Sequence, residues 1–167
     1  TAAQMKWISD YQFVRGINLL VIGGYPLSQD DWLQAGCRPN FGSHDPVWDY
    51  MDVYHDYIGR LSYMLSLGKP EIRIALYYPV NDLWAGGSDF KEVCSAHDNL
   101  ARSLLENQCD FDLIDDDILS GTSSSVKGGK LHVGPMQYEA VYISANRYMP
   151  PATVSKLEKF AKAGGKV

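Results

Sequence analysis

The sequence has only three cysteines, no long apolar run and no cluster of basic residues. Cys37, Cys94 and Cys109 follow neither a Cys-x-x-Cys nor a zinc-ligand spacing, so we interpret them as unpaired thiols. Unpaired thiols leave the cellular compartment open. No apolar stretch approaches the roughly 20 residues that span a bilayer, so we expect no membrane partner.

The charge balance is acidic. The 167 residues contain 15 Lys and Arg against 20 Asp and Glu, a net charge of -5 at pH 7. Because no basic patch is present to neutralise phosphates, we expect no nucleic-acid partner. Hydrophobic residues make up 46% of the chain and charged residues 21%, which is typical of a folded globular domain. The 11 Tyr and 4 Trp suit a carbohydrate site, but they fill cores equally well.

Several catalytic and nucleotide-binding motifs are also absent from the sequence. It has no Gly-x-Ser-x-Gly elbow, no Gly-x-Gly-x-x-Gly and no Gly-x-x-x-x-Gly-Lys phosphate loop. Cys94 falls inside a predicted helix rather than at a strand-to-helix turn, which weakens an amidotransferase-like interpretation. No nucleophile therefore has the local context that its chemistry requires.

The first 69 residues predict two helices, one strand and a long loop. Residues 3–15 have helical spacing, and the apolar run Ile17–Ile22 is typical of a parallel strand covered on both faces. The loop 23–45 also holds aromatic residues, which favours a functional loop over a disordered one. Apolar residues recur every three or four positions over 46–67, which predicts a helix with Ser43 or Asp45 as its N-cap.

From residue 70 onward, strands and helices alternate. This alternation predicts a parallel sheet covered by helices, and right-handed crossovers favour a flavodoxin-like strand order. We therefore predict a domain boundary between 69 and 70. The expected elements are strands within 71–79, 111–115, 138–144 and 164–167, a strand-like insert at 130–134 suited to a hairpin edge, helices within 89–108 and 150–164, a long loop at 79–87 and a flexible loop at 120–129.

Five aspartates lie close together between residues 110 and 117. Several carboxylates in one place suit a divalent metal. The pattern does not match a calcium-binding loop, however, and the aspartates flank a short strand whose Phe111, Leu113 and Ile114 suit a core. We therefore favour a structural role, in which the aspartates cap the next turn, and predict no metal site in this chain.

His44 lies in the long loop, just before the second predicted helix. It suits substrate contact or proton transfer as well as it suits a local hydrogen-bonding role. The loop leaves the carboxyl end of the predicted strand, which is where α/β folds place their sites.

Several segments together resemble glycoside hydrolase family 106, the α-L-rhamnosidase-like proteins of polysaccharide-degrading bacteria. Each segment is short, but their order and spacing cover nearly the whole chain. They are "RGINLLVI", "FGSH", Trp48, "YIGRLSYMLSLGK", "LYYP", "FDLIDDDIL", "GGKLHV", "YEAVYIS" and "LEKFAKAGGKV".

The resemblance implies that residues 1–69 contain the last strand, an active-site loop and the last helix of a catalytic (β/α)8 barrel. Residues 70–167 would be a flavodoxin-like or amidotransferase-like accessory domain, incomplete at its C-terminus. Phe41, Gly42 and His44 match a Phe-Gly-x-His element of the family. Relatives often have His where this chain has Gly23, which puts the substrate pocket of this chain in question.

The first hypothesis is thus a fragment of a rhamnosidase-like glycoside hydrolase. Its partners would be a plant or microbial polysaccharide and the remainder of its own barrel. By the resemblance, the catalytic carboxylates and a calcium site lie on earlier barrel strands, outside this chain, and a secreted or periplasmic location is favoured. This chain would contribute Tyr25, Trp32 and His44 to the substrate pocket.

Two alternatives stay open. Residues 70–167 could be a non-catalytic interaction module that forms homo-oligomers. They could also be a flavodoxin-like or amidotransferase-like enzyme, for which Cys94 would be the residue to test.

Overall fold

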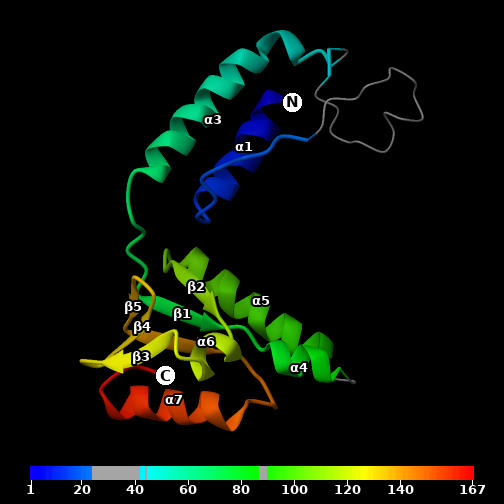
Figure 1. Cartoon of the computed structure of the whole chain (residues 1–167). Helices are drawn as coiled ribbons and strands as arrows, with labels where there is room; N and C mark the ends of the chain where they lie inside the picture. The colour runs from blue at the N-terminus through cyan, green and yellow to red at the C-terminus, as the bar shows by residue number, and fades with distance from the viewer. Residues whose placement is uncertain (24–41, 44, 87–89) are drawn as a thin grey trace. The chain divides into compact units, whose positions relative to one another are not determined.

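The computed structural model describes residues 1–23, 42–43, 45–86 and 90–167 (Figure 1). The chain divides into two compact units, Thr1–Lys69 and Pro70–Val167. Among the described residues, no helix has both the length and the apolar character needed to cross a bilayer.

The first unit is helical in the part that the structure describes. Helix α1 spans Ala2–Phe13 and begins with a capping box, in which Thr1 and Gln4 exchange hydrogen bonds between side chain and backbone. This confirms the helix predicted at 3–15, although it starts and ends slightly earlier. Helix α3, Met51–Ser66, follows a short 3-10 helix at Trp48–Tyr50.

The second helix begins later than the predicted residue 46. The Asp45 side chain accepts a hydrogen bond from the backbone N–H of Val47 at 2.8 Å, and the Asp45 carbonyl accepts one from Trp48 at 2.9 Å. These bonds form a turn tighter than an α-helix. Asp45, one of the two predicted capping residues, therefore caps the turn that precedes α3 rather than α3 itself.

The strand predicted at Ile17–Ile22 does not form in this chain. Residues 18–23 have no regular secondary structure, and the side chains of Leu19 and Val21 are 73% and 91% exposed. A strand needs a neighbour to pair with its backbone N–H and C=O groups. The described part of the first unit contains no strand that could supply this pairing.

Helices α1 and α3 are joined by a polar contact. The Ser9 and Tyr54 hydroxyl groups lie 2.6 Å apart, and the Tyr57 phenol donates to the Asp10 carboxylate at 2.5 Å. The Lys6 ammonium group also reaches Asp10 at 2.5 Å and lies 4.7 Å from the centre of the Tyr57 ring. Five polar side chains thus fix how the two helices pack.

The second unit contains a parallel sheet between helices, which confirms the predicted α/β class. Its strand order is β2-β1-β6, and both strand pairs are parallel. Lys166 adds an isolated parallel bridge to Ala140, so the strand predicted at 164–167 is present as a single pairing. The strands are β1 (Ile74–Tyr77), β2 (Phe111–Ile114) and β6 (Ala140–Ile143), and the helices are α4 (Val80–Ala85), α5 (Phe90–Glu106), α6 (Asp116–Ser120) and α7 (Pro151–Lys162).

Two segments predicted as loops are ordered elements instead. The flexible loop predicted at 120–129 contains β3 (Ser124–Lys127), which pairs with β4 (Lys130–Val133) and, through it, with β5 (Met136–Tyr138) in an antiparallel sheet. Gly128 and Gly129, with φ of 58° and 74°, form the two-residue turn of the β3–β4 hairpin. Residues 80–85, also predicted as loop, form α4.

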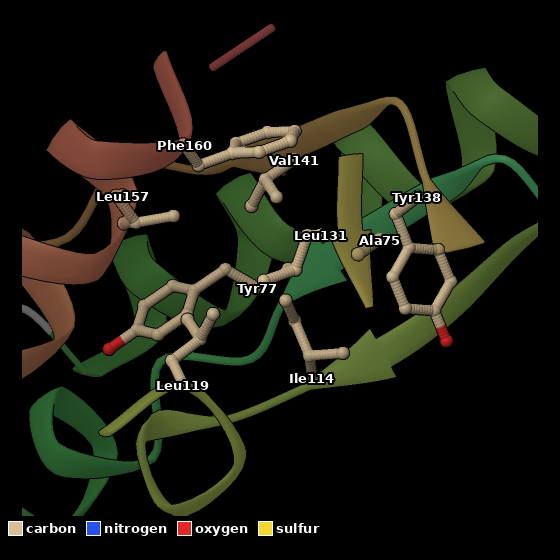
Figure 2. Packing of buried hydrophobic residues seen from close by; sticks show 9 residues of the cluster. All are labelled: Ala75, Tyr77, Ile114, Leu119, Leu131, Tyr138, Val141, Leu157 and Phe160. Carbon is tan, nitrogen blue, oxygen red and sulfur yellow. The ribbon is translucent and has the colours of Figure 1, made fainter. Parts of the chain in front are cut away.

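The two faces of the parallel sheet pack against different helices. Ala75 and Tyr77 of β1 belong to a buried cluster with Leu157 and Phe160 of α7 (Figure 2). The alternate residue Leu76 is equally buried but lies outside that cluster, because neighbouring side chains along a strand point to opposite faces. Figure 1 shows α5 and α7 on opposite sides of the sheet.

Candidate functional site

The three predicted substrate-pocket residues, Tyr25, Trp32 and His44, lie outside the described residues. Their role therefore stays a prediction. The described part of the chain has its own concentration of buried polar groups, at the carboxyl edge of the parallel sheet in the second unit. Ligands of open α/β sheets bind at this edge, so we take it as the candidate site.

Asp116 is the centre of this site. It is the first residue of α6, two positions after the last residue of β2, and only 6% of it is exposed. Its carboxylate accepts hydrogen bonds from the Tyr77 phenol at 2.9 and 3.0 Å, from the Thr153 hydroxyl at 2.7 Å, and from the Asn81 amide. One side chain thus connects β1, α4, α6 and α7.

Burial raises the pKa of the Tyr77 phenol far above its ordinary value, and the hydrogen bond to Asp116 raises it further. The phenol therefore stays protonated and continues to donate across the physiological pH range. Figure 2 shows the Tyr77 and Tyr138 hydroxyl groups at opposite ends of the core cluster. Tyr138 makes the equivalent contact there, donating to Asp112 at 2.7 Å.

Asp82 is the second buried carboxylate of the edge. It lies on α4, and its two oxygens accept the backbone N–H groups of Arg147 at 2.6 Å and Tyr148 at 2.7 Å. This fixes the segment that follows β6 against the helix that follows β1. The side chains of Tyr148, whose backbone is held by this contact, and of Trp84 on α4 are 60% and 82% exposed.

Two further polar side chains are buried at the edge. Ser144 directly follows β6, and His97 lies on α5 with its ring 5.2 Å from that of Tyr78 at an angle of 75°. Burial lowers the pKa of the His97 imidazole, and the charge of Asp98 acts in the opposite direction. Among the residues that the structure describes, neither His97 Nδ1 nor Ser144 Oγ has a hydrogen-bond partner.

The aspartate cluster has the structural role that we favoured. Asp115 caps α6 by accepting the Ile118 N–H at 2.9 Å, and Asp110 accepts the Phe111 N–H at 2.9 Å. Within the described ranges, no group of three or more His, Cys, Asp or Glu residues is arranged to hold a metal ion. The expectation that Leu113 faces the core is wrong, since its side chain is 54% exposed.

The buried carboxylates at the carboxyl edge of the sheet are suited to holding elements of the fold together rather than to proton transfer. Asp116 and Asp82 already accept several hydrogen bonds each from groups of the fold itself. Cys94 lies within α5, inside the helix as predicted. Sequence reasoning missed the importance of Asp82 and Asp116, although both follow parallel strands, a position that could have identified them.

The family model described as alpha-L-rhamnosidase matches residues 1–167 of this chain. Among solved structures, that of a rhamnosidase from Novosphingobium sp. PP1Y is similar, with a TM-score of 0.62 and 20% sequence identity. The similarity covers 99% of this chain and 15% of that chain, and at this identity it concerns the fold alone. No curated protein matches the chain.

Proposed function

The chain belongs to glycoside hydrolase family 106, the alpha-L-rhamnosidases, and we propose that it is a part of such an enzyme that joins one β/α unit of the catalytic barrel to an α/β accessory domain. In the complete enzyme, two catalytic carboxylates would flank the glycosidic bond that is cleaved. We place both carboxylates outside residues 1–167. The family match over the whole chain is the observation that carries the proposal.

The segment 17–22 supports the barrel part of the proposal. Its apolar side chains include Leu19 and Val21, which are exposed in this chain. The interior strands of a (β/α)8 barrel are apolar and pair with a neighbour on each side. A strand upstream of residue 1 would supply the pairing that this segment lacks among the described residues.

The strand order supports the accessory-domain part. The order β2-β1-β6, with Lys166 pairing beside β6, agrees with the flavodoxin-like arrangement, in which the first strand lies inside the sheet. Because the buried carboxylates of this unit hold its own elements together, we assign it a supporting role and place sugar binding in the first unit.

In this proposal, Tyr25, Trp32 and His44 form one wall of the sugar pocket. The test is hydrolysis of p-nitrophenyl α-L-rhamnopyranoside by the complete enzyme. We expect Trp32→Ala and His44→Ala to reduce kcat/KM by about tenfold or more, because each removes a contact to the sugar worth roughly 1–3 kcal/mol. His55→Ala is the control, because His55 is an exposed histidine of α3.

Unchanged kinetics of Trp32→Ala and His44→Ala would remove these residues from the pocket. Full activity of residues 1–167 alone, without the remainder of a barrel, would overturn the assignment of the catalytic carboxylates to other parts of the enzyme.

A second role for residues 70–167 is self-association through the carboxyl edge. Trp84 and Tyr148 are exposed there, and Asp82 fixes the backbone of Tyr148. Large aromatic residues of this kind dominate the binding energy of many protein interfaces. Sedimentation of the wild-type chain and of Trp84→Ala tests this role. We expect a dimer or trimer that dissociates in the variant, and a wild-type monomer at high concentration would exclude it.

A further inference from the structure

His97 and Ser144 lie on the same face of the parallel sheet. Tyr77 and Ile143 are partners in the register of β1 and β6, and both face the side covered by α7. Tyr78 and Ser144 directly follow the ends of these two strands, so their side chains point to the other side of the sheet. That side is covered by α5, because the Tyr78 ring meets the His97 ring of α5 edge to face.

A second contact connects α5 to the segment after β6. The Arg147 guanidinium lies 3.9 Å from the Glu92 carboxylate of α5, five residues before His97 along the helix. The sheet register, the ring contact and this ion pair all bring the end of β6 to α5. His97 therefore packs on Tyr78, and Ser144 holds the matching position after β6 on the same face of the sheet.

Both side chains are buried beyond nine-tenths of their surface, His97 at 8% exposed and Ser144 at 9%. Their polar atoms, His97 Nδ1 and Ser144 Oγ, have no hydrogen-bond partner within the described ranges. Buried polar atoms in folded proteins are nearly always paired, because leaving one unpaired destabilises the fold by about 1–3 kcal/mol. Each of the two atoms thus lacks a partner, and both residues lie on the face of the sheet that α5 covers.

We propose that His97 Nδ1 and Ser144 Oγ together bind one hydroxyl group, supplied by a buried water molecule or by a small polyol such as a sugar. The chemistry of both groups fits a hydroxyl. A serine hydroxyl can donate and accept, and a neutral imidazole has one donor and one acceptor nitrogen. A hydroxyl also donates and accepts, and it brings no net charge into a buried site.

The two sources of the hydroxyl differ in what they imply. A water molecule would make the site part of the structure of the second unit. A sugar hydroxyl would make the site a secondary carbohydrate site, separate from the pocket proposed for the first unit. Only the sugar source rests on the proposed function, so failure of the sugar source would leave the hydroxyl site itself intact.

The test is nitrogen NMR of the histidine rings in the full chain. The sequence has four histidines, so the His97 signals can be assigned by their loss in His97→Phe. We expect Ser144→Ala to shift the His97 Nδ1 signal, because the variant removes one anchor of the shared hydroxyl. Ser95→Ala is the matched control on exposed α5 surface and should leave the signal unchanged.

The wild-type chain distinguishes the sources without any variant. A saturable shift of the His97 signals during titration with L-rhamnose assigns the hydroxyl to a sugar. Cross-relaxation between the His97 ring and a long-lived water, with no effect of L-rhamnose, assigns it to water. If Ser144→Ala leaves His97 unchanged, or if the wild-type chain shows neither a sugar effect nor a bound water, the proposal is wrong.

Discussion

The Tyr77 phenol lies within hydrogen-bonding distance of both oxygens of the Asp116 carboxylate, at 2.9 and 3.0 Å, and both residues are buried. Tyr77 is the last residue of β1, and Asp116 is the first residue of α6. The pair therefore connects the central strand of the sheet to the helix that follows a neighbouring strand.

Removing the carboxylate should destabilise the second unit strongly. We expect Asp116→Ala to lower its free energy of unfolding by about 3 kcal/mol, because the variant leaves buried donors of Tyr77 and Thr153 without an acceptor. Tyr77→Phe removes one donor and should lower it by about 1 kcal/mol. The measurement is urea denaturation of the full chain, followed by the amide NMR signals of β1. Asp98→Ala, on the exposed surface of α5, should have little effect. Equal stability of all three variants would contradict the central role of Asp116.

Asp82 should limit the local opening of the segment that follows β6. Asp82→Ala removes the acceptor of the Arg147 and Tyr148 amides, so these amides should exchange with solvent roughly tenfold faster or more. The measurement is hydrogen exchange of the full chain by NMR. The amides of β4 in the separate antiparallel sheet provide the internal reference. If the amides of β4 exchange faster by the same factor, Asp82→Ala destabilises the whole unit, and Asp82 does not act on the segment after β6 alone.

Gly165 should not tolerate even the smallest side chain. A Cβ at this position would lie 2.1 Å from the ring of Phe160, which is completely buried in the core cluster. We expect Gly165→Ala to lower the free energy of unfolding by about 3 kcal/mol, because the packed ring has to move. Gly59→Ala is a contrasting control in the first unit, since no atom lies within 4 Å of its added Cβ and alanine favours the helix. Native-like stability of Gly165→Ala, measured by urea denaturation, would mean that Phe160 can repack at little cost.

His97 should make stability depend on pH. Burial lowers its pKa in the folded state, so below about pH 6.5 the unfolded chain binds more protons than the folded chain. The contribution of His97 is fully present above this pH and is lost as the pH falls through and below it. We expect His97→Phe to flatten the decrease in stability between pH 7 and pH 5, measured by urea denaturation. His55→Gln should retain the decrease, because His55 is exposed. A decrease that survives in His97→Phe would assign it to other groups.

The sequence predicted the elements whose patterns are local. The helices α5 and α7 were predicted from apolar spacing, and β1 and β6 from short apolar runs, because each pattern is complete within its own segment. Of the hairpin at 124–133, β4 was predicted and its partner β3 was missed, although Gly128-Gly129 between two short runs is a recognised two-residue turn signal. Its serines directed the interpretation toward a flexible loop, whereas Ser124 is buried in the structure.

The remaining differences depend on partners that are distant in the sequence. Whether Ile17–Ile22 forms a strand depends on a neighbour that the described part of the chain does not supply. Asp116 was recognised as one of several aspartates, but its burial depends on Tyr77 and Thr153, each more than 35 residues away. Composition and local spacing contain no information on such contacts, so the sequence could indicate the position of Asp82 and Asp116 after parallel strands but not their hydrogen-bond partners.

The Asp82 contact also has a consequence for the order of folding. Asp82 and Arg147 are separated by 65 positions along the chain, and β1 precedes both of its neighbours in the sheet. During synthesis of this unit, β1 and α4 emerge first, β1 can pair with β2 next, and β6 with the residues that Asp82 binds becomes available only later. Contacts of such long range slow folding, because a large loop has to close before they can form. The central strand is therefore the first strand of this unit to be made, and its second neighbour is made only after the three strands of the antiparallel sheet.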